Sequence, residues 1–217
     1  MPLALRCVLL PVTPLQQNCS LLWNPESGHG ALIDPGGEPE RLLAAAREHG
    51  VTIDKLLLTH GHLDHAGAVA DLVEQLAVPV EGPHEDDRFW LEQLPEAARR
   101  YGFPPVRSFE PTRWLSDGDC IEVAGCELQV LHCPGHTPGH VVFHHADAKL
   151  AWVGDVLFQG SVGRSDFPRG DHEQLIASIH DQLLPLGDDV RFVPGHGPVS
   201  SFGHERRTNP YLRMAAR

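Results

Sequence analysis

Residues 59–65, THGHLDH, concentrate side chains that bind metals. Three histidines and one aspartate fall within six residues, as His60, His62, Asp64 and His65. Neutral imidazoles and carboxylates are ligands of zinc, iron and manganese, and metals held in this way activate water for hydrolysis. Histidine is also abundant in the whole chain, with 15 copies, eight of which lie in residues 60–65 and 132–145. The stretch therefore predicts a metal site.

Three further candidate ligands follow other apolar runs. LQVLHCPGH leads to His136, LAWVGD to Asp155 and VRFVPGH to His196, just as KLLLTH leads to His60. Each run reads as a strand that ends in a Gly- or Pro-rich loop, where functional residues concentrate. If the four strand ends lie at one edge of the sheets, seven N and O donors converge. Because one tetrahedral zinc takes four ligands, seven donors predict two ions that share a bridging carboxylate and a bridging water.

Each candidate ligand has a structural alternative when it is considered alone. His60 and His62 also fit exposed loop histidines, and Asp64 fits the N-cap of a helix that begins near His65. Ordinary turn residues are the alternative for the remaining three, His136, Asp155 and His196. Four independent strand ends would have to imitate one metal site by chance, so we predict the metal centre.

The apolar pattern predicts the elements that carry these residues. We expect strands within residues 3–12, 19–23, 30–37, 54–60, 78–82 and 189–197, and hairpins over 117–133 and 140–155. Helices are expected over 38–50, 65–77 and 171–186, the last with Asp171 as N-cap, and a helical region over 85–101. Antiparallel hairpins mixed with helical crossovers predict an α+β fold, with layered sheets covered by helices.

Composition narrows the class of protein. The 29 acidic residues outnumber the 17 basic ones, and a net charge of −12 argues against nucleic acid as a partner. No apolar stretch approaches the ~20 residues of a membrane span, and Arg6 interrupts the short apolar run at the N-terminus, which reads as a strand. Five cysteines without a C-x-x-C pair indicate a reduced, cytoplasmic protein.

The combined motif resembles the metallo-β-lactamase superfamily, whose hallmark is H-x-H-x-D-H. THGHLDH carries the hallmark, and CPGHTPGH, VGD and PGHG match the later motifs in order. The resemblance covers nearly the whole chain and implies one domain over residues 1–217, a four-layer αββα sandwich with the metals at one sheet edge. It assigns His60, His62 and His136 to one metal and Asp64, His65 and His196 to the other. Asp155 would bridge them with a hydroxide, so that Asp64 and Asp155 become the catalytic carboxylates.

Within the superfamily, the chain is most similar to the short bacterial hydroxyacylglutathione hydrolases. PVTPLQQNCSLLW, IDPGG, CPGHTPGHVVF and GDVLFQGSVGRSDFPRGD carry this similarity. It implies hydrolysis of S-lactoylglutathione or another hydroxyacylglutathione with two divalent ions, zinc first and iron or manganese as alternatives. The extra C-terminal helical domain with which longer members bind glutathione is not expected. Arg164 and Arg169 are the predicted contacts of a substrate carboxylate, and their alternative is an ion pair with Asp166 or Asp171.

Other activities stay open at this stage. GR-x-DF also resembles the persulfide dioxygenases, in which one iron would take His60, His136 and Asp155. A non-catalytic binding module is a third hypothesis, which the intact ligand set disfavours. True β-lactamases are disfavoured because the chain shows no secretion signal and because many of them carry another residue at the position that matches Asp64. Nucleases are disfavoured by the acidic net charge. Asp34 in LIDPGG is either an acceptor for a ligand histidine or a turn former. The sequence does not predict the oligomeric state.

Overall fold

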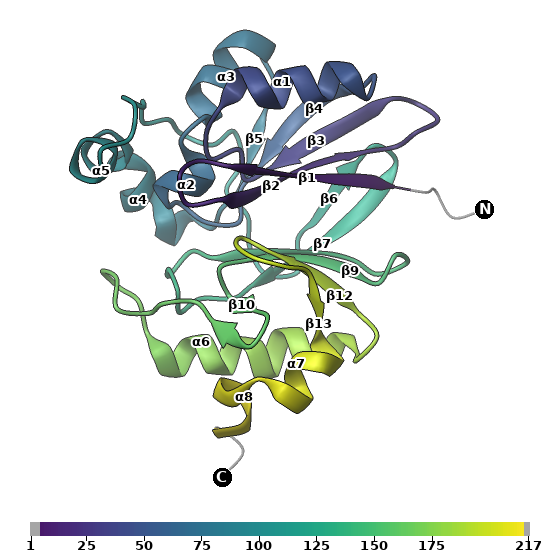
Figure 1. Cartoon of the computed structure of the whole chain (residues 1–217), viewed down its shortest axis with the longest axis vertical. Helices are drawn as coiled ribbons and strands as arrows, with labels where there is room; N and C mark the ends of the chain where they lie inside the picture. The colour runs from purple at the N-terminus through teal and green to yellow at the C-terminus, as the bar shows by residue number, and fades with distance from the viewer. Residues whose placement is uncertain (1–4, 215–217) are drawn as a thin grey trace.

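A computed structural model describes residues 5–214 and places two β-sheets face to face between helices (Figure 1). The first sheet has the spatial order β1 (Arg6–Val12), β2 (Gln17–Trp23), β3 (His29–Ile33), β4 (Thr52–Leu57), β5 (Val80–Glu81). The second has the order β13 (Ser200–Ser201), β12 (Arg191–Pro194), β9 (Leu150–Gly154), β8 (Val141–His145), β7 (Cys126–His132), β6 (Cys120–Val123). A separate short ribbon pairs β10 (Leu157–Phe158) with β11 (Ser161–Val162).

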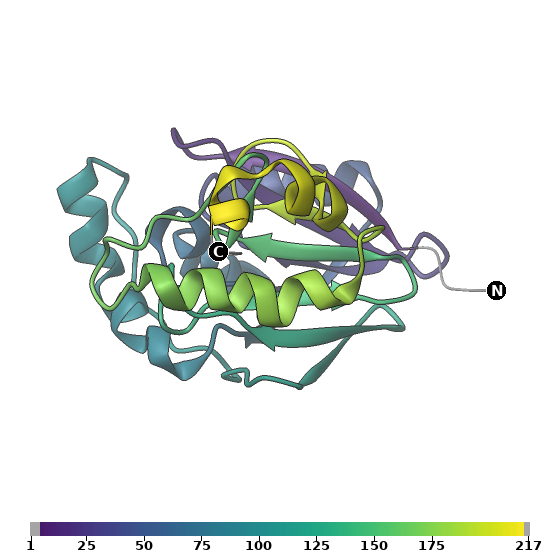
Figure 2. The ribbon, with the colours of Figure 1, turned by 90° about the horizontal axis from the view of Figure 1, so that it is seen from below.

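Helices cover the outer face of each sheet. On the first sheet lie α1 (Pro39–Glu48) and α3 (Val69–Leu76), and on the second α6 (His172–Ser178) and α7 (Phe202–Thr208) (Figures 1 and 2). At one end of the sandwich lie α2 (Leu63–Ala66), a 3-10 turn (Glu85–Asp87), α4 (Arg88–Glu92) and α5 (Leu94–Tyr101). A π-helical turn (Ile179–Leu183) and a 3-10 turn (Leu184–Leu186) extend α6, and α8 (Pro210–Met214) follows α7. The arrangement confirms the predicted α+β class and its αββα layers.

Three apolar clusters fill the spaces between the four layers. Successive residues of a strand point to opposite faces, so Leu21 packs toward the helices and Leu22 toward the second sheet. Leu42 of α1 joins the first cluster, and Phe143 of β8 joins the cluster between the sheets. Because both faces of these strands are buried, their sequences read as continuous apolar runs. None of the helices among residues 5–214 has the length and apolar character to span a membrane.

Most predicted elements form, and two helical predictions differ. The hairpin turn at Ala124 and Gly125 has positive φ at both residues (53° and 83°), and Asp171 caps α6 by accepting from Gln174 N at 3.0 Å. The helix predicted over 65–77 is wrong as one element, because it breaks into α2 and α3. At the break the backbone packs closely on a neighbouring loop, since a Cβ on Gly67 would lie 2.6 Å from Gly36 O. The region predicted over 85–101 likewise divides into three short segments.

The topology brings four strand ends to one edge. In the second sheet β12 is parallel to β9, while β8 is antiparallel to both β9 and β7, so β7, β9 and β12 run in the same direction. Their carboxyl ends meet at the edge where β4 of the first sheet also ends. The loops that follow these four strands carry the predicted ligands.

Candidate metal centre

All seven predicted ligands lie together at this edge. His60, His62, Asp64 and His65 come from the segment after β4 and from α2. Loops after three strands of the second sheet supply the others: His136 after β7, Asp155 after β9, and His196 after β12. Their side chains form two groups whose ligand atoms lie within 4.8 Å of one another, the histidine trio (His60, His62, His136) and the mixed trio (Asp64, His65, His196).

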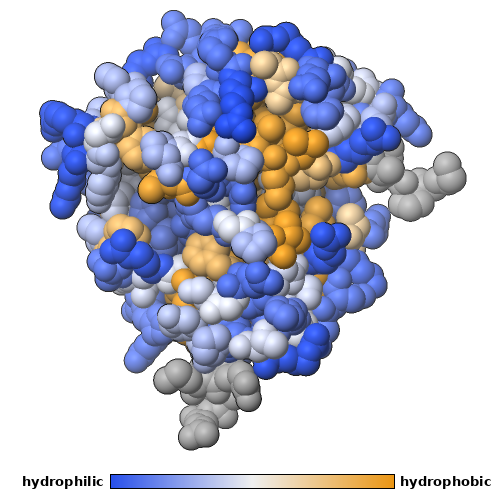
Figure 3. All heavy atoms as spheres, viewed as in Figure 1, coloured by the Kyte–Doolittle hydropathy of each residue, from blue (hydrophilic) through white to orange (hydrophobic). Residues whose placement is uncertain are grey.

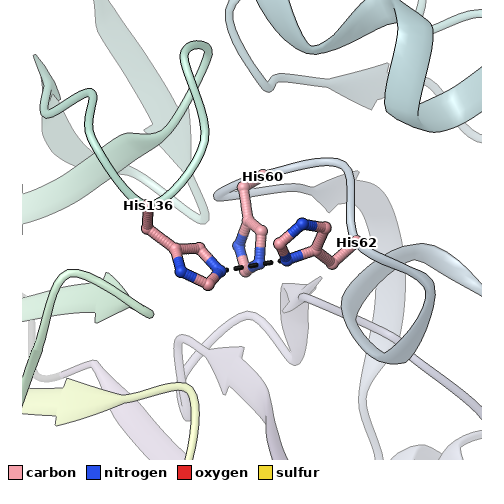
Figure 4. A group of neighbouring side chains, drawn as sticks. All are labelled: His60, His62 and His136. Atoms are coloured by element: carbon pink, nitrogen blue, oxygen red, sulfur yellow. Dashed lines mark hydrogen bonds between the residues drawn. The ribbon is translucent and has the colours of Figure 1, made fainter. Parts of the chain in front are cut away.

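The histidine trio converges on one point (Figure 4). His62 Nδ1 lies 3.0 Å from His136 Nε2, and the His60 ring centroid lies 4.8 and 4.9 Å from the other two. Metal–nitrogen bonds of 2.0–2.1 Å in a tetrahedron place ligand atoms about 3.4 Å apart. The observed separation of the two nitrogens therefore fits a common ion.

Asp155 connects the two trios. In the mixed trio Asp64 Oδ2 lies 3.1 Å from His196 Nε2 and 3.9 Å from His65 Nε2. Asp155 Oδ1 lies 3.3 Å from His65 Nε2, while its Oδ2 lies 3.6 Å from His136 Nε2 and 3.7 Å from His196 Nε2. One carboxylate thus faces both trios, which is the place of a bridging ligand.

Buried polar atoms in this cluster have no hydrogen-bond partner within the described chain. They are Nε2 of His60, His62 and His65 and Oδ1 of Asp155. A buried polar atom without a partner costs about 1–3 kcal/mol, and native proteins rarely leave one so. Several such atoms at one point are explained when a cation binds them, so the residues present fit a metal centre.

Hydrogen bonds also set the tautomer of four of the five histidines. Nδ1 of each contacts an oxygen: His60 with Thr59 Oγ1 at 3.0 Å, His65 with Asp34 Oδ2 at 2.9 Å, His136 with Arg164 O at 2.6 Å, and His196 with Leu15 O at 3.1 Å. An imidazole that donates from Nδ1 keeps its lone pair on Nε2. In all four, that Nε2 faces the cluster, ready to bind a cation.

The charges of the cluster suit a cation as well. Burial lowers the pKa of His60, His62 and His136, which keeps these imidazoles neutral. Burial acts in the same direction on His65, but the carboxylates of Asp155 and Asp64 outweigh it and raise its pKa. Burial alone would raise the pKa of Asp155, yet the charge of His65 holds it below its ordinary value. The histidine trio therefore offers neutral imidazoles, and the Asp155 carboxylate beside it stays ionised.

Comparison with known proteins identifies the family. The sequence model of the metallo-beta-lactamase superfamily matches residues 12–196. The chain belongs to the metallo-β-lactamase superfamily. The resemblance seen in the sequence is thereby confirmed, and the protein is a metallo-hydrolase of this superfamily.

Individual relatives are similar over nearly their whole length. "Hydroxyacylglutathione hydrolase GloC" of Haemophilus influenzae is 49% identical over 94% of this chain and 96% of its own. The structure titled "Crystal structure of TTHA1623 in a di-iron-bound form" is 42% identical, with a TM-score of 0.84 over 94% of this chain and 100% of that one. The structure titled "Crystal structure of BLEG-1 B3 metallo-beta-lactamase" is 35% identical, with a TM-score of 0.88 over 95% and 99%.

Asp34 fills both roles that its sequence allowed. It takes a positive φ of 53° in the turn after β3. Its carboxylate also accepts from Thr59 N at 2.7 Å, Thr59 Oγ1 at 2.6 Å and His65 Nδ1 at 2.9 Å. Asp34 thus holds one candidate ligand, His65, directly and a second, His60, through the hydroxyl of Thr59.

Asp64 differs from its structural alternative. It lies inside the first turn of α2 and makes no N-cap hydrogen bond, because the cap position belongs to His62. Its carboxylate turns instead to His196. The reading of Asp64 as an ordinary helix cap is therefore wrong.

Two buried residues near the site, Asp87 and His140, are not among the residues that the sequence predicts for it. The Asp87 carboxylate accepts from Gly61 N at 2.8 Å, Thr137 Oγ1 at 2.8 Å and Gly139 N at 2.6 Å. Burial raises its pKa to about 7 against these three hydrogen bonds. His140 Nε2 accepts from Asp155 N at 3.1 Å, and its ring stacks on His60 at 4.7 Å.

The two predicted substrate-binding arginines lie differently. Arg164 lines a cavity of about 390 Å³, which we term the central cavity and whose wall includes five of the seven candidate ligands. Its Nε and Nη2 bind Asp166 at 2.9 and 2.8 Å, so the alternative ion pair is present. The Arg169 guanidinium lies 4.4 Å from the centre of the Phe89 ring, outside the lining of the central cavity.

Proposed function

We propose that the protein is a dinuclear metal-dependent thioesterase that hydrolyses a hydroxyacylglutathione, with S-lactoylglutathione as the first candidate. The observation that carries the proposal is the pair of trios joined by the Asp155 carboxylate. The relative named hydroxyacylglutathione hydrolase, at 49% identity over 94% of the chain, supports the substrate class. Zinc is the first candidate for both ions, and the di-iron title of a similar structure supports iron as an alternative.

Two transition-metal ions held by the seven ligands would supply a water activated at neutral pH and a positive field for charge that develops on the substrate oxygen. In the overall reaction, water adds to the thioester carbonyl carbon, the carbon–sulfur bond breaks, and the thiolate takes up a proton. The products are a carboxylic acid and a thiol. No oxidant or reductant is needed.

The protein's own groups position this reaction. The Asp64 and Asp155 carboxylates lie on the wall of the central cavity, where they would orient the attacking water. Phe158 and Phe167 on the same wall reduce access of bulk water to the reacting carbon. Hydrogen bonds from Nδ1 keep four of the five imidazoles in one orientation.

Arg164 is the proposed contact for a glutathione carboxylate. It borders the central cavity and is largely exposed, and Asp166 engages its Nε and Nη2, which leaves Nη1 for a ligand. A guanidinium binds carboxylates through several parallel hydrogen bonds. We retain Arg169 as a secondary candidate that would act from outside the cavity.

Metal analysis and three assays on one preparation test the proposal. We expect about two zinc, iron or manganese ions per chain by elemental analysis and cleavage of S-lactoylglutathione. Asp155→Asn should lower both, whereas Asp54→Asn, at an exposed site, should change neither. One iron per chain with oxygen consumption on glutathione persulfide and no thioester cleavage would instead identify a dioxygenase. Cleavage of a chromogenic cephalosporin alone would identify a β-lactamase. If none of the three substrates is turned over, the protein would be a non-catalytic binding module.

A further inference from the structure

A second cavity of about 370 Å³ opens beside the metal centre, and we term it the apolar pocket. Trp90 of α4, Leu94, Ala97 and Tyr101 of α5, and Phe103 and Phe167 form most of its wall. It shares Leu15, His62, Asp64, Arg164 and Phe167 with the central cavity, so the two cavities adjoin. A volume of this size is typical of pockets that bind whole small molecules.

The wall of the apolar pocket is built directly against a metal-ligand candidate. The His62 ring meets Trp90 edge to face at 4.5 Å and Phe167 at 4.8 Å between centroids. Gly61 permits this contact, because a Cβ there would lie 2.7 Å from Trp90 Cβ. A group in the apolar pocket therefore lies next to the atoms that would act on a thioester in the central cavity.

Apolar side chains at the mouth of the pocket are exposed. Leu15 is 56% and Tyr101 61% exposed, the two largest values for a large apolar residue in the described chain. In Figure 3, small groups of hydrophobic residues lie at the left of the molecule, where α4 and α5 lie, and a larger group lies near the centre. Exposed aromatic and aliphatic groups around a cavity mark a surface that an apolar ligand covers.

The charges decide which arm of a thioester this pocket suits. Glutathione carries two carboxylates and one ammonium group, and burial of such groups without partners is unfavourable. Among the described residues that line the pocket, Arg164 is the one cation, and it lies at the border with the central cavity, bound to Asp166. The apolar pocket therefore suits the acyl arm, while the glutathione arm lies toward the central cavity and Arg164.

Resting on the proposed function, we infer that the preferred substrate is an acylglutathione with a bulky apolar acyl group, aromatic or branched. The three-carbon lactoyl group fills only a small part of the apolar pocket. A phenyl group in place of the lactoyl methyl reaches the wall formed by Trp90, Ala97 and Tyr101. Burial of a phenyl group is worth about a 10- to 100-fold gain in kcat/KM when the pocket is already formed.

The test compares S-mandeloylglutathione with S-lactoylglutathione, which differ by this one replacement. On the metal-loaded protein we expect kcat/KM to be about 10- to 100-fold higher for the mandeloyl thioester than for the lactoyl thioester. Ala97→Phe, which fills the pocket, should bring the ratio close to one, and Ala44→Phe on the exposed face of α1 is the matched control. Tyr101→Ala should lower the mandeloyl-to-lactoyl ratio of kcat/KM about threefold. Tyr211→Ala, at another exposed tyrosine, is its control and should leave the ratio unchanged. Because Tyr101 is exposed, its replacement by alanine should leave the fold intact.

A binding measurement separates the pocket from catalysis. In saturation-transfer NMR, mandelate should receive strong saturation at its phenyl protons, lactate should receive little, and Ala97→Phe should abolish the mandelate signal. A kcat/KM for the lactoyl thioester equal to or higher than that for the mandeloyl thioester would overturn the inference and leave the proposed function standing. A mandeloyl preference that Ala97→Phe and Tyr101→Ala leave unchanged would also overturn it. If neither thioester is cleaved, the proposed function is overturned as well.

Discussion

Asp87 Oδ2 accepts a hydrogen bond from the backbone N–H of Gly61 at 2.8 Å. Gly61 stands between two members of the histidine trio, His60 and His62. The same carboxylate binds Thr137 and Gly139, which follow the third member, His136. One fully buried side chain thus joins the two loops that form the histidine trio, one from each sheet.

Asp87→Asn should weaken metal binding by the histidine trio. All three partners of the carboxylate are donors, so an amide NH₂ in its place faces at least one donor and leaves it without an acceptor. Loss of a group that orients ligands lowers metal affinity about 10- to 100-fold. Chelator competition at constant pH measures this affinity.

The matched control for this substitution is Asp86→Asn. Asp86 is the preceding residue, and its side chain is 58% exposed, so we expect the same change there to leave metal affinity within about twofold. Equal affinity of Asp87→Asn and the unsubstituted protein would show that the two loops hold their positions without this carboxylate.

Asp34→Asn should act on the mixed trio in the same way. Its three partners, Thr59 N, Thr59 Oγ1 and His65 Nδ1, are all donors, so the amide again opposes one of them. Asparagine accepts the positive φ of 53°, so the backbone imposes no added strain. We expect a loss of about 1–3 kcal/mol in the free energy of unfolding and weaker binding of one ion.

Thermal unfolding and metal stoichiometry after dialysis check this prediction. Asp54→Asn is the control, because Asp54 is an exposed partner of a histidine, His29 at 2.9 Å, outside the site. A variant that retains two ions and full stability would mean that the hydrogen bond from His65 Nδ1 to Asp34 is dispensable.

The convergence of the candidate ligands could be predicted from the sequence because each follows its strand within a few residues. The apolar run and the Gly- or Pro-rich loop place His136, Asp155 and His196 before any tertiary contact is known. Asp87 has no such signal, because it lies in the acidic run EDD and its partners are backbone groups of two distant loops. The break between α2 and α3 also depends on tertiary packing, here on the loop at Gly36.

The apolar pocket likewise could not be predicted from the sequence. Its wall combines α4 and α5 with Phe167, which lies 77 positions after Trp90. Helical periodicity shows that α5 has an apolar face, but not that the face is shared between the core and a cavity. The structure shows the division, since Ala98 is buried in the core cluster and Tyr101 is exposed at the pocket mouth.

Arg164→Ala should raise KM for a glutathione thioester and leave kcat nearly unchanged. The guanidinium would bind a substrate carboxylate equally in the ground and transition states, and loss of uniform binding changes KM. We expect an increase of roughly three- to tenfold, which Arg164→Lys should restore in part. Arg107→Ala removes another exposed paired arginine and should leave KM unchanged. A fall in kcat with constant KM would place Arg164 in a different role.

Cys120 should be the one thiol of the five that reacts quickly in the native protein. It is exposed, whereas Cys19, Cys126 and Cys133 are buried, and burial raises the pKa of Cys7 to about 11. Restricted access slows alkylation of the three buried thiols, and since the thiolate is the reactive form, the strongly raised pKa of Cys7 slows it there. Iodoacetamide labelling followed by peptide mass spectrometry measures each site, and comparable labelling of Cys133 and Cys120 would contradict the buried placement.

The pH dependence of this labelling has a defined sign. The hydrogen bond to Glu127 raises the pKa of Cys120, because the carboxylate favours the protonated thiol. The labelling rate should therefore rise with pH through a range above the ordinary thiol pKa. Glu127→Gln removes the charge, which lowers the pKa and should speed labelling at pH 7.5, whereas Glu48→Gln on an exposed part of α1 should not. Identical pH profiles for Glu127→Gln and the unsubstituted protein would show that Glu127 does not control this thiol.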